Sequence, residues 1–129
     1  MMAHVIMGPI PTEAQEQRTL FEWAAVMTQR YPVLRLMHHI PNGGSRNPAE
    51  ARNLRAQGVR PGVPDIFLPC ARGGRHGLYI ELKRQRGGRV SAEQREMLEA
   101  LREQGYKAEV CAGWEAARDV IIKYLEGKE

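Results

Sequence analysis

The spacing of hydrophobic residues predicts a helix near the start of the chain. Apolar side chains recur there every three or four residues, which places them on one face of a helix. Thr12 suits the N-cap and Glu13 the first turn, while Pro32 blocks continuation. The residues expected on the buried face are Leu20, Trp23, Ala24, Met27 and Tyr31.

Four further segments have the apolar content or alternation that is typical of strands. The clearest is 78–83, where Leu78, Ile80 and Leu82 alternate with polar or aromatic residues. The apolar run Ile66-Phe67-Leu68, led by Asp65, predicts a strand just before it, and the glycine-rich stretch between the two predicts a hairpin-type loop. The other two predicted strands cover 33–40 and 106–112.

Three more helices are predicted. A short helix from Ala49 ends at Gly58, a residue that suits the position after a helix. Ser91 and Gln94 have the spacing of a capping box at the start of the next one. The last covers 114–125. The order α-β-α-β-β-α-β-α predicts an α/β fold with a small mixed sheet flanked by helices.

Length and composition indicate a single globular domain over 1–129, with 1–11 as a flexible N-terminal segment. The chain is 43% hydrophobic and 26% charged, which is ordinary for a soluble protein. No apolar run approaches the roughly 20 residues that span a bilayer. Without features of a secretory signal, and with Cys70 and Cys111 expected to be reduced, a cytoplasmic location is predicted.

Positive charge gathers in the middle of the chain. The formal net charge is only +4, but arginines dominate between residues 46 and 89. Such a basic centre is typical of proteins that bind a polyanion such as nucleic acid. A solvated surface rich in ion pairs would have the same composition, so charge alone leaves both interpretations open.

Asp65, Glu81 and Lys83 are the best candidates for chemistry. Glu81 and Lys83 share one face of their strand, and Asp65 begins the strand before it. In a hairpin the two carboxylates would approach each other, and they would repel unless a cation lay between them. Mg²⁺ prefers one or two carboxylates plus water and phosphate oxygens. The backbone carbonyl of Leu82 offers a further oxygen, and Lys83 would orient a water.

The Glu-x-Lys pattern also has a simpler interpretation. It often occurs by chance, as a solvated ion pair worth under about 1 kcal/mol. Three features favour a site instead: the proline before Asp65, the apolar strand around Glu81, and the loop 84–89 that follows. That loop is basic and rich in glycine, which suits close contact with phosphates.

The segment "GVPDIFLP", followed along the chain by "GLYIELK", resembles the PD-(D/E)xK nuclease motif. More narrowly, the chain resembles the VRR-NUC family of small, often phage-encoded nucleases. The segments "EAQEQ", "PNGGSR", "AQGVRPGVPD" and "VSAEQREML" also match, so the resemblance runs from about Glu13 to Leu125. The connector reads Val59-Arg60-Pro61, so the second arginine of the family's namesake triplet is absent, while the metal-binding residues are all present.

The resemblance implies a restriction-endonuclease-like core and a role for each matching residue. Asp65, Glu81 and the carbonyl of Leu82 would hold Mg²⁺ or Mn²⁺, and Lys83 would position the nucleophilic water. A glutamate of the first helix would complete the acidic cluster. Both Glu13 and Glu16 are candidates. Glu13 is favoured because family members usually place this acid four residues before a glutamine, as Glu13 stands before Gln17.

The supporting residues have alternative interpretations. Glu13 would also suit the positive N-terminal end of its helix for electrostatic reasons alone. Gln94, expected to support the site, would equally serve only the capping box. Of the adjacent His38 and His39, only one can face the site, and core or supporting roles are preferred to metal ligation for both. The residues expected to contact the substrate are Asn42, Arg46, Arg84, Arg86, Arg89 and Gln17, although turn chemistry explains Asn42 equally well.

The leading hypothesis is a metal-dependent DNA endonuclease. The resemblance suggests a homodimer that selects branched or junction DNA, since two identical sites across a two-fold axis suit such a substrate. The main alternative is a nucleic-acid-binding module without catalysis, in which the acidic pair is structural. A third hypothesis is an interaction subunit of a larger assembly. No membrane partner is expected.

Overall fold

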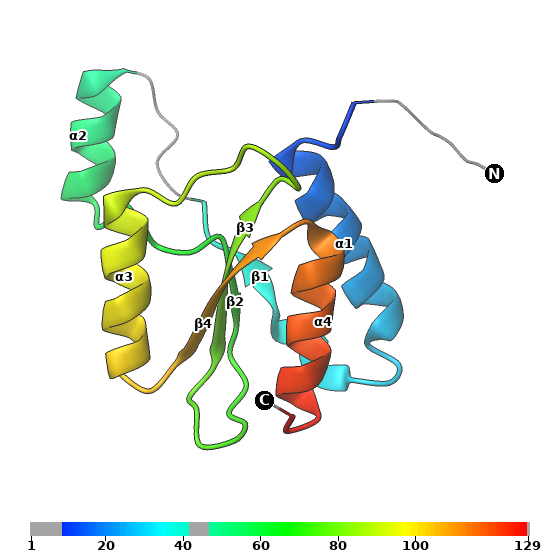
Figure 1. The fold of residues 1–129 in the computed structure, drawn as a ribbon. Helices are drawn as coiled ribbons and strands as arrows, with labels where there is room; N and C mark the ends of the chain where they lie inside the picture. Colours follow the sequence, from blue (N-terminus) through cyan, green and yellow to red (C-terminus); the bar gives the residue numbers. More distant parts are fainter. Residues whose placement is uncertain (1–8, 42–46, 129) are drawn as a thin grey trace.

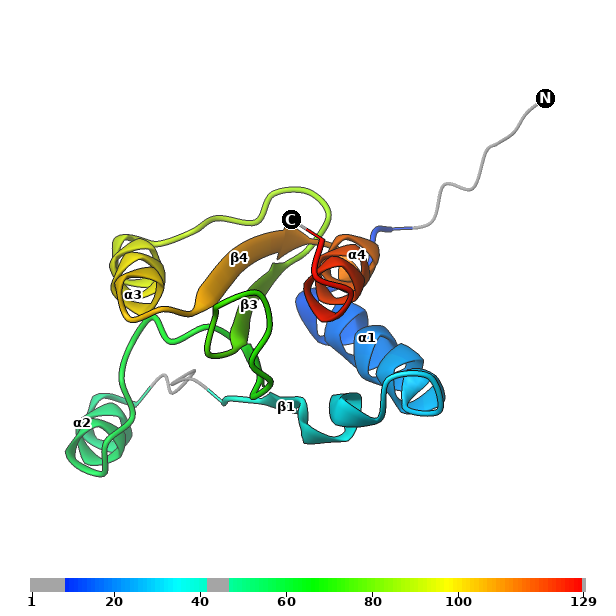
Figure 2. The same cartoon turned by 90° about the horizontal axis from the view of Figure 1, so that it is seen from below.

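A four-stranded mixed sheet with helices on both faces forms the centre of the molecule (Figures 1 and 2). The computed structural model describes residues 9–41 and 47–128, so the first eight residues of the predicted flexible segment lie outside it. The α/β prediction is confirmed. The elements are α1 (Glu13–Met27), the 3₁₀ helix η1 (Pro32–Leu36), β1 (His38–His39), α2 (Pro48–Ala56), β2 (Ile66–Leu68), β3 (Leu78–Lys83), α3 (Ala92–Glu103), β4 (Lys107–Ala112) and α4 (Trp114–Leu125).

The strands lie in the order β1-β2-β3-β4. β2 and β3 pair antiparallel, with Ile66 opposite Ile80 and Leu68 opposite Leu78, which confirms the predicted hairpin. β4 runs parallel to β3. A parallel neighbour requires a crossover connection, and α3 supplies it. The start of β2 and the end of β3 therefore lie at the same end of the sheet, where the predicted site residues meet.

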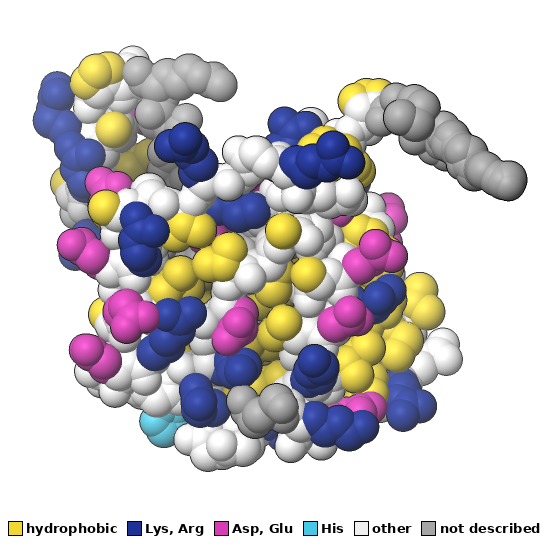
Figure 3. All heavy atoms as spheres, viewed as in Figure 1, with side chains coloured by type: hydrophobic (Ala, Val, Ile, Leu, Met, Phe, Trp, Pro, Cys, Tyr) yellow, Lys and Arg dark blue, Asp and Glu magenta, His cyan; other side chains and the backbone are white. Residues whose placement is uncertain are grey.

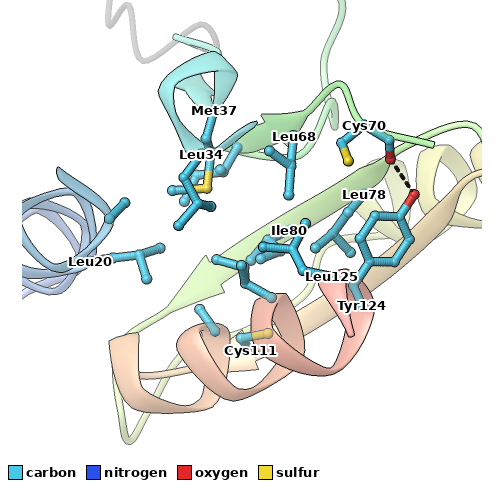
Figure 4. Packing of buried hydrophobic residues seen from close by; sticks show 14 of the residues in the cluster. Leu20, Leu34, Met37, Leu68, Cys70, Leu78, Ile80, Cys111, Tyr124 and Leu125 are labelled. Carbon is cyan, nitrogen blue, oxygen red and sulfur yellow. Dashed lines mark hydrogen bonds between the residues drawn. The ribbon is translucent and has the colours of Figure 1, made fainter. Parts of the chain in front are cut away.

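One face of the sheet packs against α1 and α4 and contains the hydrophobic core (Figure 4). Leu78, Ile80 and Leu82 of β3 point into it and are each only 1% exposed. The hydroxyl of Tyr124 in α4 donates a hydrogen bond to the carbonyl of Cys70 at 2.6 Å. α3 packs beside β4 on the other face (Figure 2). Alternate residues of β3 consequently face two different environments.

The prediction of a strand over 33–40 is correct only for its second half. Residues 33–36 lie in η1, and the two histidines of β1 pair with β2. Leu34 and Met37 are buried three residues apart, while Leu36 between them is 39% exposed. Burial at every third position is the period of a 3₁₀ turn, whereas a strand would bury every second residue.

α2 stands apart from the rest of the fold (Figures 1 and 2). Asn47 caps it by accepting hydrogen bonds from Ala49 and Glu50, and none of its residues is buried. The predicted helix end is confirmed, since Gly58 just beyond it has a φ of +108°. No helix in the described ranges is both long and apolar enough to cross a membrane.

Candidate active site

Asp65 lies beside the end of β3 because of the hairpin register. The backbone N–H of Leu82 donates a hydrogen bond to its Oδ2 at 2.8 Å, while the N–H of Ile40 donates to its carbonyl at 2.7 Å. Pro64, just before it, is buried. The carboxylate is thereby fixed next to Glu81, as the hairpin prediction required.

Glu81 is a buried carboxylate with incomplete hydrogen bonding. It is only 2% exposed. Its Oε2 accepts a hydrogen bond from Gln94 Nε2 at 2.9 Å and lies 3.3 Å from Lys83 Nζ, whereas its buried Oε1 has no hydrogen-bond partner among the described residues. Burial, and then the neighbouring Asp65, raise the pKa of Glu81 to about 7. Lys83 offsets this rise only in part, so full ionisation of Glu81 at neutral pH would require a further positive charge.

Gln94 joins α3 to this acidic pair. It closes the predicted capping box with Ser91, and its Oε1 also lies 3.3 Å from Lys83 Nζ. Its Nε2 also donates a hydrogen bond to Glu81, so the same side chain closes the capping box and contacts the acidic pair. Gly62, with a φ of +86°, lets the connector approach α3 closely, since a side chain there would overlap the backbone of Glu93.

The two glutamates of α1 lie in different surroundings. Glu16 is 1% exposed, and its carboxylate accepts hydrogen bonds from the Trp114 N–H at 3.1 Å and from Gln85 Nε2 at 3.0 Å. It therefore ties α1 to the start of α4 and to the loop after β3. Glu13 is exposed and, with Gln17, lines a hollow that Asp65 also lines.

This hollow connects α1, β1 and the hairpin. Its volume is about 230 Å³, and its lining residues are Glu13, Ala14, Gln17, His39, Asp65 and Leu82. Of the two histidines, only His39 lines it; the ring of His38 meets Phe67 edge-on at 5.8 Å instead. Tyr79 stacks on Phe67 at 4.3 Å, which is a packing contact.

Comparison with known proteins shows which family the chain belongs to. The model of the VRR-NUC domain matches residues 11–115, which is most of the chain. The chain belongs to the VRR-NUC family. A solved structure described as a VRR_NUC domain protein is 30% identical, with a TM-score of 0.79 over 96% of this chain and 94% of that one. A search of curated proteins finds no match.

The VRR-NUC match confirms the resemblance that the motifs predicted and places the chain in a nuclease family. The matched range contains Asp65, Glu81, Lys83 and Gln94 together with both candidate acids of α1. It also contains the hollow beside Asp65.

Nucleases of this kind generally depend on a metal, and the acidic pair of this VRR-NUC domain fits one. In the ranges 9–41 and 47–128, no three His, Cys, Asp or Glu side chains converge as a ready-made metal cluster. The pair itself, however, offers two carboxylates and a buried oxygen, Glu81 Oε1, without a partner in those ranges. Mg²⁺ needs only one or two carboxylates, since waters and substrate oxygens complete its shell.

The predicted basic contacts of the VRR-NUC domain are spread more widely. Arg86 and Arg89 are exposed on the loop after β3, and Gly88 of that loop packs against Lys83. Arg84 lines a separate hollow of about 690 Å³ beside the start of α1. The two remaining residues, Asn42 and Arg46, lie outside the described residues. In Figure 3, Lys and Arg side chains gather over α2 and along the top of the molecule.

Sequence reasoning missed the structural role of Glu16. A pattern for it was present, because Glu16, Leu20 and Ala24 are four residues apart and all three are buried in α1. That spacing places Glu16 on the apolar face of the helix. Gln85, its partner, carries no comparable signal, since its contact joins residues 69 positions apart in the chain.

Proposed function

We propose that this protein is a metal-dependent DNA endonuclease that hydrolyses phosphodiester bonds at Asp65, Glu81 and Lys83. The observation that carries the proposal is the state of Glu81. A buried carboxylate with a raised pKa and a partnerless oxygen lies beside a second acid and a lysine. Such an arrangement destabilises the fold without a compensating cation, and perturbed acids of this kind cluster at functional sites.

Asp65, Glu81 and the Leu82 carbonyl would hold Mg²⁺ or Mn²⁺, with Glu13 as a further ligand from the opposite wall of the hollow. When bound, the cation lowers the pKa of a water and offsets the charge that develops on the phosphate. Lys83 Nζ is held between Glu81 and Gln94. From that position it orients the attacking water, and Gln94 keeps both side chains in place.

The DNA backbone would lie across the same end of the molecule. Gln17 borders the hollow, and Arg86 and Arg89 extend from the exposed loop beside Lys83. Phosphate contacts of this sort position a duplex without reading its sequence. Asn42, Arg46 and Arg84 would make further contacts along the strand.

We further propose that the enzyme acts as a homodimer on branched DNA. The family resemblance supports this, because paired active sites related by a two-fold axis suit the symmetry of a four-way junction. Sedimentation of the free protein and of its junction complex measures the oligomeric state. A monomer in both would contradict the dimer but not the chemistry.

The test compares cleavage of supercoiled plasmid, linear duplex and a four-way junction. The wild type is expected to cut in Mg²⁺ or Mn²⁺ and to be inactive with chelator, and Asp65→Ala is expected to be inactive throughout. Asp119→Ala, which removes an exposed acid of α4, is the matched control and should cut normally. Equal cleavage by Asp65→Ala would contradict the site. Binding without cleavage under every condition would favour a non-catalytic module.

A further inference from the structure

The two histidines of β1 differ in what they contact. His38 Nδ1 lies 2.9 Å from the carbonyl oxygen of Leu36, and its ring packs edge-on against Phe67. His39 Nδ1 lies 2.8 Å from the carbonyl oxygen of Asp65, a proposed metal ligand. Adjacent strand residues point to opposite sides, so the same short strand presents one ring to packing and the other to the hollow.

Asp65 is held from both neighbouring strands. On the β1 side its carbonyl oxygen accepts two hydrogen bonds, from the Ile40 N–H and from His39 Nδ1. On the β3 side its carboxylate accepts the Leu82 N–H. Asp65 precedes β2 and is not part of that strand. These hydrogen bonds, and not strand pairing of Asp65 itself, therefore set the direction of its carboxylate. Loss of the imidazole would leave a single hydrogen bond on the β1 side.

The hydrogen bond to Asp65 also fixes the state of the His39 ring. A carbonyl oxygen only accepts, so Nδ1 must carry the proton. His39 is exposed, and within the described residues its ring makes its hydrogen bond with Asp65. A side chain with so little burial contributes little packing energy. The hydrogen bond to Asp65 is therefore the main interaction by which His39 affects the surrounding structure.

We propose that His39 is the positioning residue of the metal-binding aspartate. Its Nδ1–H holds the Asp65 backbone against β1, so that the carboxylate stays aimed at Glu81 and at the Leu82 amide. The metal-binding part of this inference rests on the proposed function. The positioning part concerns the fold of this chain and has its own readout.

Four variants distinguish the contributions of the two ring nitrogens of His39 from each other and from that of packing. His39→Ala removes both nitrogens. His39→Asn keeps an amide N–H close to the place of Nδ1, and His39→Gln keeps one close to the place of Nε2. His38→Ala is the matched control, because it removes the neighbouring imidazole without touching Asp65. Thermal unfolding of each variant establishes that it is folded.

The first readout is hydrogen exchange of the Leu82 amide, measured by NMR without metal. Exchange is expected to accelerate in His39→Ala and His39→Gln but not in His39→Asn or His38→Ala. The second readout is the Kd for Mn²⁺ by calorimetry. It should rise about 10-fold in the first two variants, the lower end of the loss seen when supporting contacts of metal ligands are removed.

Each outcome decides one claim. Wild-type exchange and Mn²⁺ affinity in His39→Ala would overturn the inference. Rescue by Gln rather than Asn would overturn it too, since it would assign the role to Nε2. If the exchange pattern is as expected but the wild type takes up no Mn²⁺, positioning of Asp65 stands and the proposed metal chemistry fails.

Discussion

Neighbouring residues of β3 are almost equally buried on two chemically opposite faces. Ile80 and Leu82 are each 1% exposed on the face toward α1 and α4, and Glu81 is 2% exposed on the other. The apolar face is satisfied by packing alone. On the polar face a carboxylate oxygen lacks a partner among the described residues, and the pKa of Glu81 is raised. Burial alone therefore does not distinguish the hydrophobic core from the candidate site. The distinguishing features are the carboxylate oxygen without a hydrogen-bond partner and the raised pKa of Glu81.

Among changes to β3, the largest effect is expected from Lys83→Ala on the polar face. Removal of the ammonium proposed to orient the water should slow DNA cleavage by about 100-fold or more, the contribution typical of a positioned proton-handling group. Initial rates on supercoiled plasmid measure it. Lys123→Ala, an exposed lysine of α4, is the control. Rates within error of the wild type would remove Lys83 from the mechanism.

Ile80→Ala tests the apolar face. The cavity left in the core should lower the free energy of unfolding by about 2–5 kcal/mol. Urea titration followed by circular dichroism measures the change. Cleavage per folded molecule should stay at the wild-type rate, because the side chain faces away from Glu81. A selective loss of cleavage would show that the two faces are not independent.

The pH dependence of the free energy of unfolding should also distinguish the polar face of β3 from its apolar face. The pKa of Glu81 is raised from 4.5 to about 7 in the folded protein, so its protonated form is favoured there. Without metal, the free energy of unfolding should therefore fall as the pH rises from 4.5 to about 7. The slope of this fall should be at most about 1.4 kcal/mol per pH unit, the limit for a single titrating group.

Glu81→Gln should abolish this fall, and Mn²⁺ should reduce it in the wild type by compensating the carboxylate. The measurement is urea unfolding at a series of pH values, with chelator and with Mn²⁺. Parallel curves for wild type and Glu81→Gln would contradict the raised pKa.

The two acids of α1 should show the smallest and most specific effects. Glu16→Ala leaves the Trp114 N–H and the Gln85 amide without an acceptor, which should cost about 1–3 kcal/mol of stability. Glu13→Ala should leave stability nearly unchanged and slow cleavage. Melting temperatures and plasmid nicking rates for both variants measure the two effects. The reverse pattern would make Glu16 the functional acid.

Local patterns predicted much of this fold. The N-cap predicted at Thr12 and the capping box predicted for Ser91 and Gln94 are both confirmed, because the residues involved lie within one helical turn of each other. The alternation in 78–83 predicted β3, and its hairpin with β2 brought Asp65 to Glu81. These features depend on neighbours in the chain or across one short turn, so the sequence contains them directly.

The failures came where distant contacts decide the structure. Residues 33–40 contain enough long apolar side chains to suit a strand, but packing of Leu34 and Met37 against the core selects η1 instead. The role of Glu16 was also missed, because its hydrogen bond with Trp114 joins α1 to the start of α4. That geometry follows from how the two helices dock, which no local spacing specifies.

The most direct test of the metal site is calorimetric titration of Mn²⁺ into matched glutamate-to-glutamine variants. Glu81 and Glu16 are both buried glutamates, but both Glu16 oxygens have donors, whereas Glu81 Oε1 has none among the described residues. We expect Mn²⁺ binding by the wild type and by Glu16→Gln, and none by Glu81→Gln. Wild-type uptake by Glu81→Gln would contradict the claim that the polar face of β3 is a metal site.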